Sequence, residues 1–173
     1  MRQYARVRPA KPTDLSLLPA IERSAAALFA DQAGLAHLAQ GEVIAEAEHS
    51  AFLSRNCLWV AHDGGEVAGF LAATVVAGNF HIRELSVDQR VQGRGLGRAL
   101  IEAALDAARQ RGFAAATLTT FRDVPWNAPF YARCGFRMLP PAELTPALAA
   151  ILADEQAHGL PEGSRCAMLA TLD

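Results

Sequence analysis

The sequence predicts a single α+β domain that contains both strands and helices. Its 173 residues suffice for one domain with a sizeable core and are too few for two ordinary ones. Apolar residues make up 51% of the chain, which favours a packed globular fold. The clearest local pattern is an extended segment, a glycine-rich turn and an amphipathic helix over residues 80–111. No repeat, low-complexity tract or linker interrupts this order.

The first half of the chain is predicted to hold a strand, two helices and three further strands. Alternation predicts the first strand at 5–8, and Thr13 or Asp14 is a suitable N-cap for a helix over 15–29. A second helix is expected over 42–53. The next strands are expected at 57–61, 67–76 and 80–87, with turns at Asp63-Gly64-Gly65 and Gly78-Asn79.

The second half begins with the most regular helix pattern in the chain. Apolar residues recur at i, i+1, i+4, i+5 and i+8, at Leu100, Ile101, Ala104, Leu105 and Ala108. The opposite face carries Arg98, Glu102, Asp106 and Arg109, and Gly112 follows as a C-terminal glycine. Residues 114–120 are apolar and β-branched, which predicts a buried parallel strand. A helix over 126–134, a strand over 135–138, a helix over 145–158 and a strand over 165–172 complete the expected order.

Composition and charge exclude several classes of protein. The formal net charge of −2 argues against a general binder of nucleic acid or of anionic membranes. No apolar run reaches membrane-spanning length, and residues 1–14 lack the apolar core of a secretory signal, so a cytoplasmic protein is expected. Cys57, Cys134 and Cys166 are too few and too widely spaced to indicate a disulfide framework or a zinc site, and no metal is expected.

The segment from residue 31 to 50 contains four acidic residues and neither lysine nor arginine. The acidic residues are Asp31, Glu42, Glu46 and Glu48. They form either a solvated acidic face or an acidic rim that attracts a cationic amine.

Three alternating glycines, Gly93, Gly95 and Gly97, stand where the central helix is expected to begin. Glycine permits positive φ and close approach of a ligand, and the first N–H groups of a helix lack intrahelical partners. These features predict a cradle for a phosphate or pyrophosphate, to which Arg90, Arg94 and Arg98 add positive charge. The alternative is an ordinary glycine-rich turn. Neither the Walker pattern nor the dinucleotide fingerprint fits, because both fail at Arg98.

Two motifs resemble those of the GNAT N-acyltransferase superfamily. Gln92-Gly93-Arg94-Gly95-Leu96-Gly97 resembles its acyl-CoA loop, and residues 127–136 resemble its Phe/Leu-Tyr-x-x-x-Gly-Phe run. The tyrosine motif is similar to that of the serotonin N-acetyltransferase group. The resemblance implies a mixed, mostly antiparallel sheet of about seven strands with splayed central strands and four to five helices. One GNAT-like domain would cover residues 1–173.

The resemblance also implies where coenzyme A binds. Main-chain groups near Leu85 and Val87 would pair with the pantetheine arm, and a free N–H there would polarise the thioester carbonyl. The residues implied in cofactor binding are Leu85, Ser86, Val87, Gln92, Gly93, Arg94, Gly95, Leu96, Gly97, Arg98 and Asn127. For Asn127, helix capping is the alternative.

The catalytic acid implied by the resemblance is Tyr131, whose phenol could protonate the departing thiolate of CoA. The alternative is that Tyr131 packs in the core. Two residues compete as the base that takes a proton from the amine: His81, whose ordinary pKa suits the task, and Glu84. Glu22 or an acidic residue of the second helix could also serve.

The predicted function is an acetyl-CoA-dependent N-acetyltransferase that transfers the acetyl group directly to a primary amine of a small molecule. Cys134 has no histidine near it in sequence, so an acyl-enzyme is not expected. One alternative acceptor is a protein N-terminus or lysine. A further alternative is a CoA-binding regulatory module without turnover. No nucleic-acid or membrane partner is expected, and the resemblance leaves a homodimer open.

Overall fold

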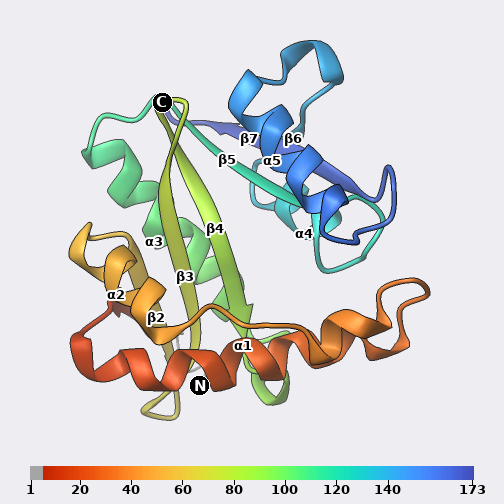
Figure 1. Cartoon of the computed structure of the whole chain (residues 1–173). Coiled ribbons are helices and arrows are strands. Elements are labelled where there is room, and N and C mark those ends of the chain that lie inside the picture. Colours follow the sequence, from red (N-terminus) through yellow and green to blue (C-terminus); the bar gives the residue numbers. More distant parts are fainter. Residues whose placement is uncertain (1–5) are drawn as a thin grey trace. The chain divides into compact units, whose positions relative to one another are not determined.

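The computed structural model describes residues 6–173, which form a seven-stranded mixed sheet and five α-helices, as predicted (Figure 1). The strand order is β1-β2-β3-β4-β5-β7-β6. The strands are β1 (Arg6–Pro9), β2 (Leu58–Asp63), β3 (Glu66–Val76), β4 (Asn79–Val87), β5 (Ala115–Phe121), β6 (Arg137–Met138) and β7 (Arg165–Thr171). The α-helices are α1 (Leu18–Ala26), α2 (Glu46–Ser54), α3 (Leu96–Gln110), α4 (Ala128–Arg133) and α5 (Pro146–Ala157). The first predicted strand included Ala5, which lies outside the described residues.

The described residues divide into two compact units, each with its own core. Unit 1 holds the described residues up to Thr74 together with Arg83–Asp106, and unit 2 holds Val75–Ile82 and Ala107–Asp173. Three elements, β3, β4 and α3, run from one unit into the other. The single domain expected from the sequence stays a prediction.

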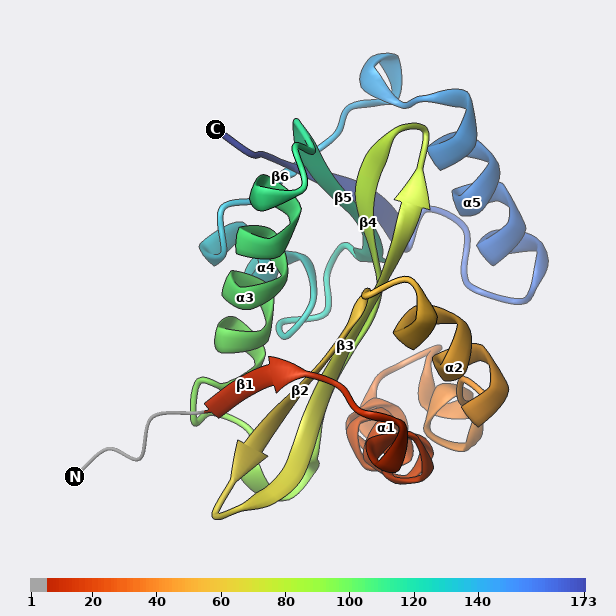
Figure 2. The same cartoon turned by 90° about the vertical axis from the view of Figure 1, so that its left-hand side faces the viewer.

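In unit 1, β1 and β3 pair antiparallel with the two edges of β2. Figure 2 shows α1 and α2 on one side of the β2–β3 hairpin and α3 on the other. The core on the first side consists of Leu15, Leu18, Ile21, Phe52, Leu58, Val60, Phe70 and Ala72. On the other side, a Cβ at Gly69 would come within 3.3 Å of the Leu100 side chain, so β3 and α3 pack closely there.

The first predicted helix is wrong at its N-terminus. A 3-10 turn (Pro12–Leu17) precedes α1, which begins at Leu18, and a second 3-10 turn (Ala27–Asp31) follows it. Asp14 is buried within the first turn, where its carboxylate accepts the Lys11 N–H at 2.7 Å and pairs with Arg8 at 2.7 Å. Neither Thr13 nor Asp14 therefore caps α1, because both lie inside the preceding turn.

The second predicted helix is shorter than expected. A 3-10 turn (Ala36–Gln40) comes first, and α2 begins only at Glu46. Residues 42–45, which were predicted to be helical, are not. The backbone N–H of Ile44 donates instead to the Glu22 carboxylate at 2.9 Å. His49 and Phe52 form the buried face of α2.

The central helix α3 has the predicted apolar face. All five residues of the predicted stripe are buried, and the four charged residues of the opposite face are exposed. The helix begins at Leu96, within the run of glycines where its start is expected, so Gly97 is its second residue. Gly112 ends it with φ +82°, and its N–H donates to the Arg109 carbonyl at 2.9 Å.

In unit 2, β5 is the parallel neighbour of β4, as predicted, with Phe80 opposite Ala116 and His81 opposite Thr117. The parting of these two strands beyond the paired residues stays a prediction. On its other edge β5 pairs antiparallel with β7, which also pairs with β6. Helix α5 lies beside β5 and β7 (Figure 1), and its N-cap Thr145 accepts the Leu148 N–H at 3.2 Å.

Within the described part of the chain, none of the helices combines the length and the hydropathy needed to cross a membrane.

Candidate cofactor and acceptor site

The glycine-rich loop adopts the backbone conformation that the sequence predicts for a phosphate cradle. Gly93 has φ +76° and Gly95 has φ +89°, a region that favours glycine. A Cβ placed on either residue would meet no atom within 4 Å, so the space above the loop is open. The Ala99 N–H donates to the Gly95 carbonyl at 3.0 Å, and the helix N–H groups before Ala99 lie at the start of α3. This end of α3 can therefore receive an anion.

A buried carboxylate, Asp88, anchors the entry to this loop. It accepts the Arg90 backbone N–H at 3.0 Å and the Arg90 guanidinium at 2.7 and 3.1 Å. It also accepts the Ser24 hydroxyl at 3.1 Å. The hydrogen bond from the Arg90 side chain lowers the pKa of Asp88 from 3.8 to about 2. Sequence reasoning missed Asp88, although an aspartate two residues before a turn N–H is a known capping signal.

Helix α1 is attached to the same loop through Ser24. The Ser24 hydroxyl accepts the Gln89 N–H at 3.0 Å while it donates to Asp88. The Gln92 amide, expected to bind cofactor, donates to the Val87 carbonyl at 3.0 Å. The loop is therefore held to α1 at one end and to the end of β4 at the other.

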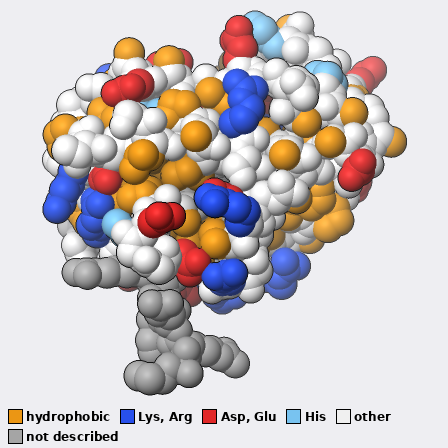
Figure 3. Space-filling model, turned by 90° about the horizontal axis from the view of Figure 1, so that it is seen from below, with side chains coloured by type: hydrophobic (Ala, Val, Ile, Leu, Met, Phe, Trp, Pro, Cys, Tyr) orange, Lys and Arg blue, Asp and Glu red, His pale blue; other side chains and the backbone are white. Residues whose placement is uncertain are grey.

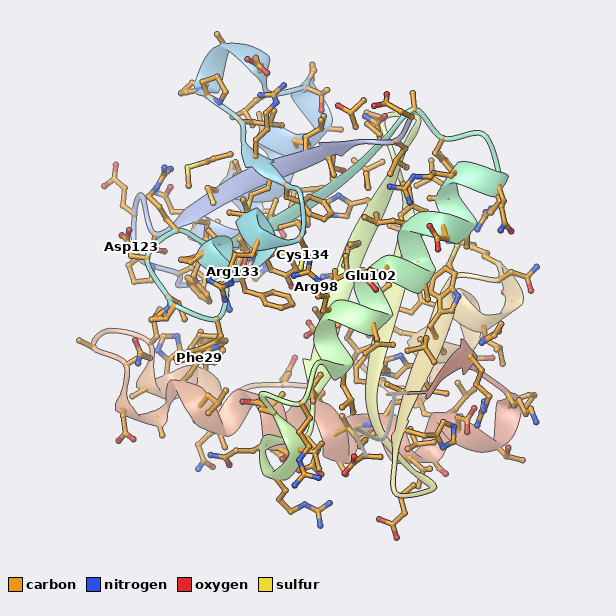
Figure 4. All side chains as sticks on the ribbon, turned by 180° about the vertical axis from the view of Figure 1, so that it is seen from behind. Phe29, Arg98, Glu102, Asp123, Arg133 and Cys134 are labelled. Atoms are coloured by element: carbon orange, nitrogen blue, oxygen red, sulfur yellow. The ribbon has the colours of Figure 1, made fainter. Side chains whose placement is uncertain are left out.

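The three arginines around the cradle are all ion-paired. Arg90 pairs with Asp88, Arg94 with Asp63 at 2.9 Å, and Arg98 with Glu102 at 3.1 Å on α3 (Figure 4). Basic and acidic side chains lie close to each other on the face seen in Figure 3. Because the Arg94 and Arg98 side chains are more than half exposed, their pairs are weak and can exchange for a phosphate.

The two base candidates on β4 fall in different units. His81, in unit 2, is buried, and its Nδ1 lies 2.9 Å from the Thr117 hydroxyl. Glu84, in unit 1, is half-buried and accepts the Ser86 hydroxyl at 2.9 Å. The Ser86 hydroxyl is therefore bonded to Glu84. That the main chain of Leu85, Ser86 and Val87 binds the cofactor stays a prediction. The choice between His81 and Glu84 also stays open.

The tyrosine motif forms helix α4 and its flanks in unit 2. Tyr131 is half-buried, and its ring makes edge contacts with Phe130 and Phe136, with centroids 5.3 and 6.0 Å away. These contacts hold the ring in place. That the Tyr131 hydroxyl acts as the catalytic acid stays a prediction. Asn127 occupies the N-cap position of α4, as the capping alternative predicts, but its side chain makes no capping hydrogen bond. Its role in cofactor binding stays a prediction. Cys134, at the end of α4 (Figure 4), is half-buried and is not part of a disulfide within the described residues.

The pKa of Glu22, on α1, is displaced upward from its usual value. Burial of the half-buried side chain raises the pKa of Glu22, and the charge of Glu48 adds to the rise. The Ile44 N–H and the charges of Arg23 and Arg83 oppose it. The acidic residues predicted as a rim, by contrast, are all exposed, which fits a solvated acidic face.

A sheet of this order, with an open helix N-terminus beside glycines of positive φ, defines a protein that can hold a phosphate-bearing ligand. The sequence pattern of the acetyltransferase (GNAT) family matches residues 25–136. The chain therefore belongs to the GNAT acetyltransferase family, and the predicted family is confirmed.

Two curated relatives and one solved structure illustrate the similarity. A mycothiol acetyltransferase from Beutenbergia cavernae is 40% identical over 68 residues, which are 38% of this chain and 23% of the relative. A probable N-acetyltransferase camello from Xenopus tropicalis is 31% identical over 114 residues, 64% of this chain and 52% of the relative. This chain thus matches about a quarter of the length of the first relative and about half of the length of the second. The PaiA N-acetyltransferase of Thermoplasma acidophilum, solved with coenzyme A, shares the fold with a TM-score of 0.73 at 14% identity; 98% of this chain and 99% of that chain are covered.

Proposed function

We propose that the protein transfers the acetyl group of acetyl-CoA to a primary amine, most simply that of a small molecule. The observation that carries the proposal is the cradle formed by Gly93 and Gly95 at the start of α3, which the buried Asp88 anchors. The family of the chain supports the reaction class. The name of the Beutenbergia relative, a mycothiol acetyltransferase, supports a small-molecule acceptor.

Each part of the proposed site has a physical task. Main-chain N–H groups between Gln92 and Arg98 would hold the diphosphate of coenzyme A, with Arg94 and Arg98 adding charge. Bound acetyl-CoA supplies the activated acyl group. Tyr131 would give its hydroxyl proton to the departing thiolate, and a base, His81 or Glu84, would accept the proton lost by the amine. Direct transfer of this kind needs no covalent enzyme intermediate.

The test combines turnover with a matched pair of glycine variants. Release of free CoA thiol from acetyl-CoA is measured across a panel of alkylamines, arylamines and short peptides. Gly95→Val and Gly65→Val impose similar strain, because these glycines have φ +89° and +91° and open space around them. Gly95→Val should abolish CoA binding by blocking approach to the main chain, whereas Gly65→Val, in the β2–β3 turn, should retain it.

Equal CoA affinity in the two variants would refute the cradle. Binding of acetyl-CoA without turnover of any amine would instead favour a CoA-binding regulatory module. Turnover confined to the peptides would move the acceptor from a small molecule to a protein.

A further inference from the structure

Glu22 differs in its partner from four other shielded carboxylates of the described chain, whereas the half-buried Glu84 accepts the Ser86 hydroxyl. Four buried or half-buried carboxylates of the described chain have a guanidinium nitrogen at 2.7–2.9 Å. The pairs are Asp14–Arg8, Asp88–Arg90, Asp63–Arg94 and Glu155–Arg165. Within residues 6–173, the half-buried Glu22 has a backbone N–H, that of Ile44, in place of such a cation. A partly desolvated carboxylate without a cation is costly unless a ligand supplies one.

The charges of Arg23 and Arg83 act on Glu22, but neither guanidinium takes the place of an ion-pair partner in the described chain. Arg23 donates its Nη1 to the Gly41 carbonyl at 2.5 Å. Arg83, on β4, is exposed and influences Glu22 through its charge. The Ile44 N–H binds Oε2, which leaves Oε1 for another donor, since a carboxylate has about four acceptor sites. An ammonium group, with three donors, matches this vacancy in charge and in hydrogen bonding.

The turn of α1 that carries Glu22 is attached to the chain directly after β4. Ser24, two residues further on, is bonded to Asp88 and Gln89 directly after β4. The charge of Arg83 on β4 acts on Glu22 itself. This turn of α1 is therefore held at the end of the strand on which Leu85 and Val87 are proposed to hold the thioester arm.

The carboxylate is also held in a fixed position. The chain from 41 to 44 is tied to α1 twice, by Arg23 at the Gly41 carbonyl and by Glu22 at the Ile44 N–H. Fixing a charged group before the ligand arrives lowers the entropy cost of binding. Glu22 precedes the residues that match the family pattern, which start at residue 25, so this feature belongs to this chain and not to that pattern.

We propose that the Glu22 carboxylate receives the protonated amine of the acceptor, which makes an alkylammonium compound the substrate class of this site. The inference rests on the proposed function, since the acceptor must lie beside bound acetyl-CoA. An arylamine, neutral at the same pH, would lack the charge that Glu22 recognises.

The test is Glu22→Gln, which removes the charge and keeps an oxygen for the Ile44 N–H. Turnover is measured at about pH 7.5 with 2-phenylethylamine, spermidine and glucosamine as alkylammonium acceptors, and with 4-ethylaniline as a neutral one. We expect kcat/KM to fall about tenfold for the ammonium acceptors and to stay within about twofold for the neutral one. The KM for acetyl-CoA should not change. Glu162→Gln, which removes an exposed carboxylate, controls for net charge.

A second readout does not depend on turnover. Calorimetric binding of spermidine to the CoA-loaded protein should weaken about tenfold in Glu22→Gln and remain in Glu162→Gln. Equal losses for charged and neutral acceptors, an unchanged Glu22→Gln, or a wild-type protein that binds acetyl-CoA but neither binds nor acetylates any of the ammonium probes would each overturn the inference. Failure of the wild-type protein to bind acetyl-CoA would instead overturn the proposed function.

Discussion

Replacement of Asp88 by asparagine should destabilise the protein in a pH-dependent manner. The pKa of Asp88 falls from 3.8 to about 2 in the folded protein. At about 1.36 kcal/mol per unit, this difference corresponds to about 2.5 kcal/mol of stability at pH 7. Because the folded-state pKa is lowered, the contribution is fully present above pH 3.8 and is lost as the pH falls through about 2. At pH 3 about half of it should remain, roughly 1.3 kcal/mol.

Urea unfolding of the wild type and of Asp88→Asn at pH 7 and pH 3 measures this difference. We expect the variant to lose about 2 kcal/mol at pH 7, because its amide oxygen keeps some of the hydrogen bonds, and about 1 kcal/mol less than that at pH 3. Asp63→Asn is the matched control, since it breaks the pair with the exposed Arg94 and should cost less than about 1 kcal/mol. A loss that is the same at both pH values, or no larger than that of Asp63→Asn, would refute the anchoring role of Asp88.

Three further outcomes follow from the described contacts. Asp88→Asn should also raise the KM for acetyl-CoA several-fold, because Asp88 accepts the Arg90 N–H at the loop entry. An unchanged KM in initial-rate kinetics would show that the loop keeps its conformation without Asp88. Tyr131→Phe should lower kcat by about a hundredfold or more with little change in CoA affinity, and a matching loss of both would mark Tyr131 as a packing residue. His49 is fully buried, and neither of its ring nitrogens has a hydrogen-bond partner among residues 6–173. Burial lowers its pKa, so stability should fall as the pH drops below 6.5; His49→Leu should gain about 1 kcal/mol at pH 7 and lose that dependence in urea titrations.

Local periodicity predicted the parts of the fold that local interactions determine. The stripe on α3 is visible in the sequence because a helix brings residues three and four apart to one face. Gly95 could be identified for the same reason, since the need for positive φ at a turn depends on a few neighbouring residues. The short elements at the N-terminus are different, because several conformations of similar free energy compete there.

The errors arise where a distant partner decides the conformation. Asp14 is a good N-cap in isolation, but Arg8 and the Lys11 N–H hold its carboxylate in the preceding turn. Ile44 lies within the predicted second helix, yet its N–H donates to Glu22, which is 22 residues away in sequence. No local rule contains either contact, so the start of each helix was misplaced.

The candidate site shows the same division. The cradle glycines could be identified from the sequence, whereas its supports could not. Ser24 and Asp88 are 64 residues apart, and their contact depends on how α1 packs within unit 1. His81 likewise meets Thr117 only because β4 and β5 pair in that register.

Three consecutive residues of α1 connect the proposed acceptor carboxylate, Glu22, to the glycine-rich loop proposed to hold the cofactor. Glu22 and Arg23 hold the chain between 41 and 44, and Ser24 holds Asp88 and Gln89. Since the same turn of α1 holds both places, a ligand bound in the cradle and an acceptor bound at Glu22 would stabilise the same contacts. By linkage, an acceptor bound at Glu22 must favour coenzyme A by the same factor. The contacts of Ser24 thus favour a ternary complex, which direct acetyl transfer requires and an acyl-enzyme route does not.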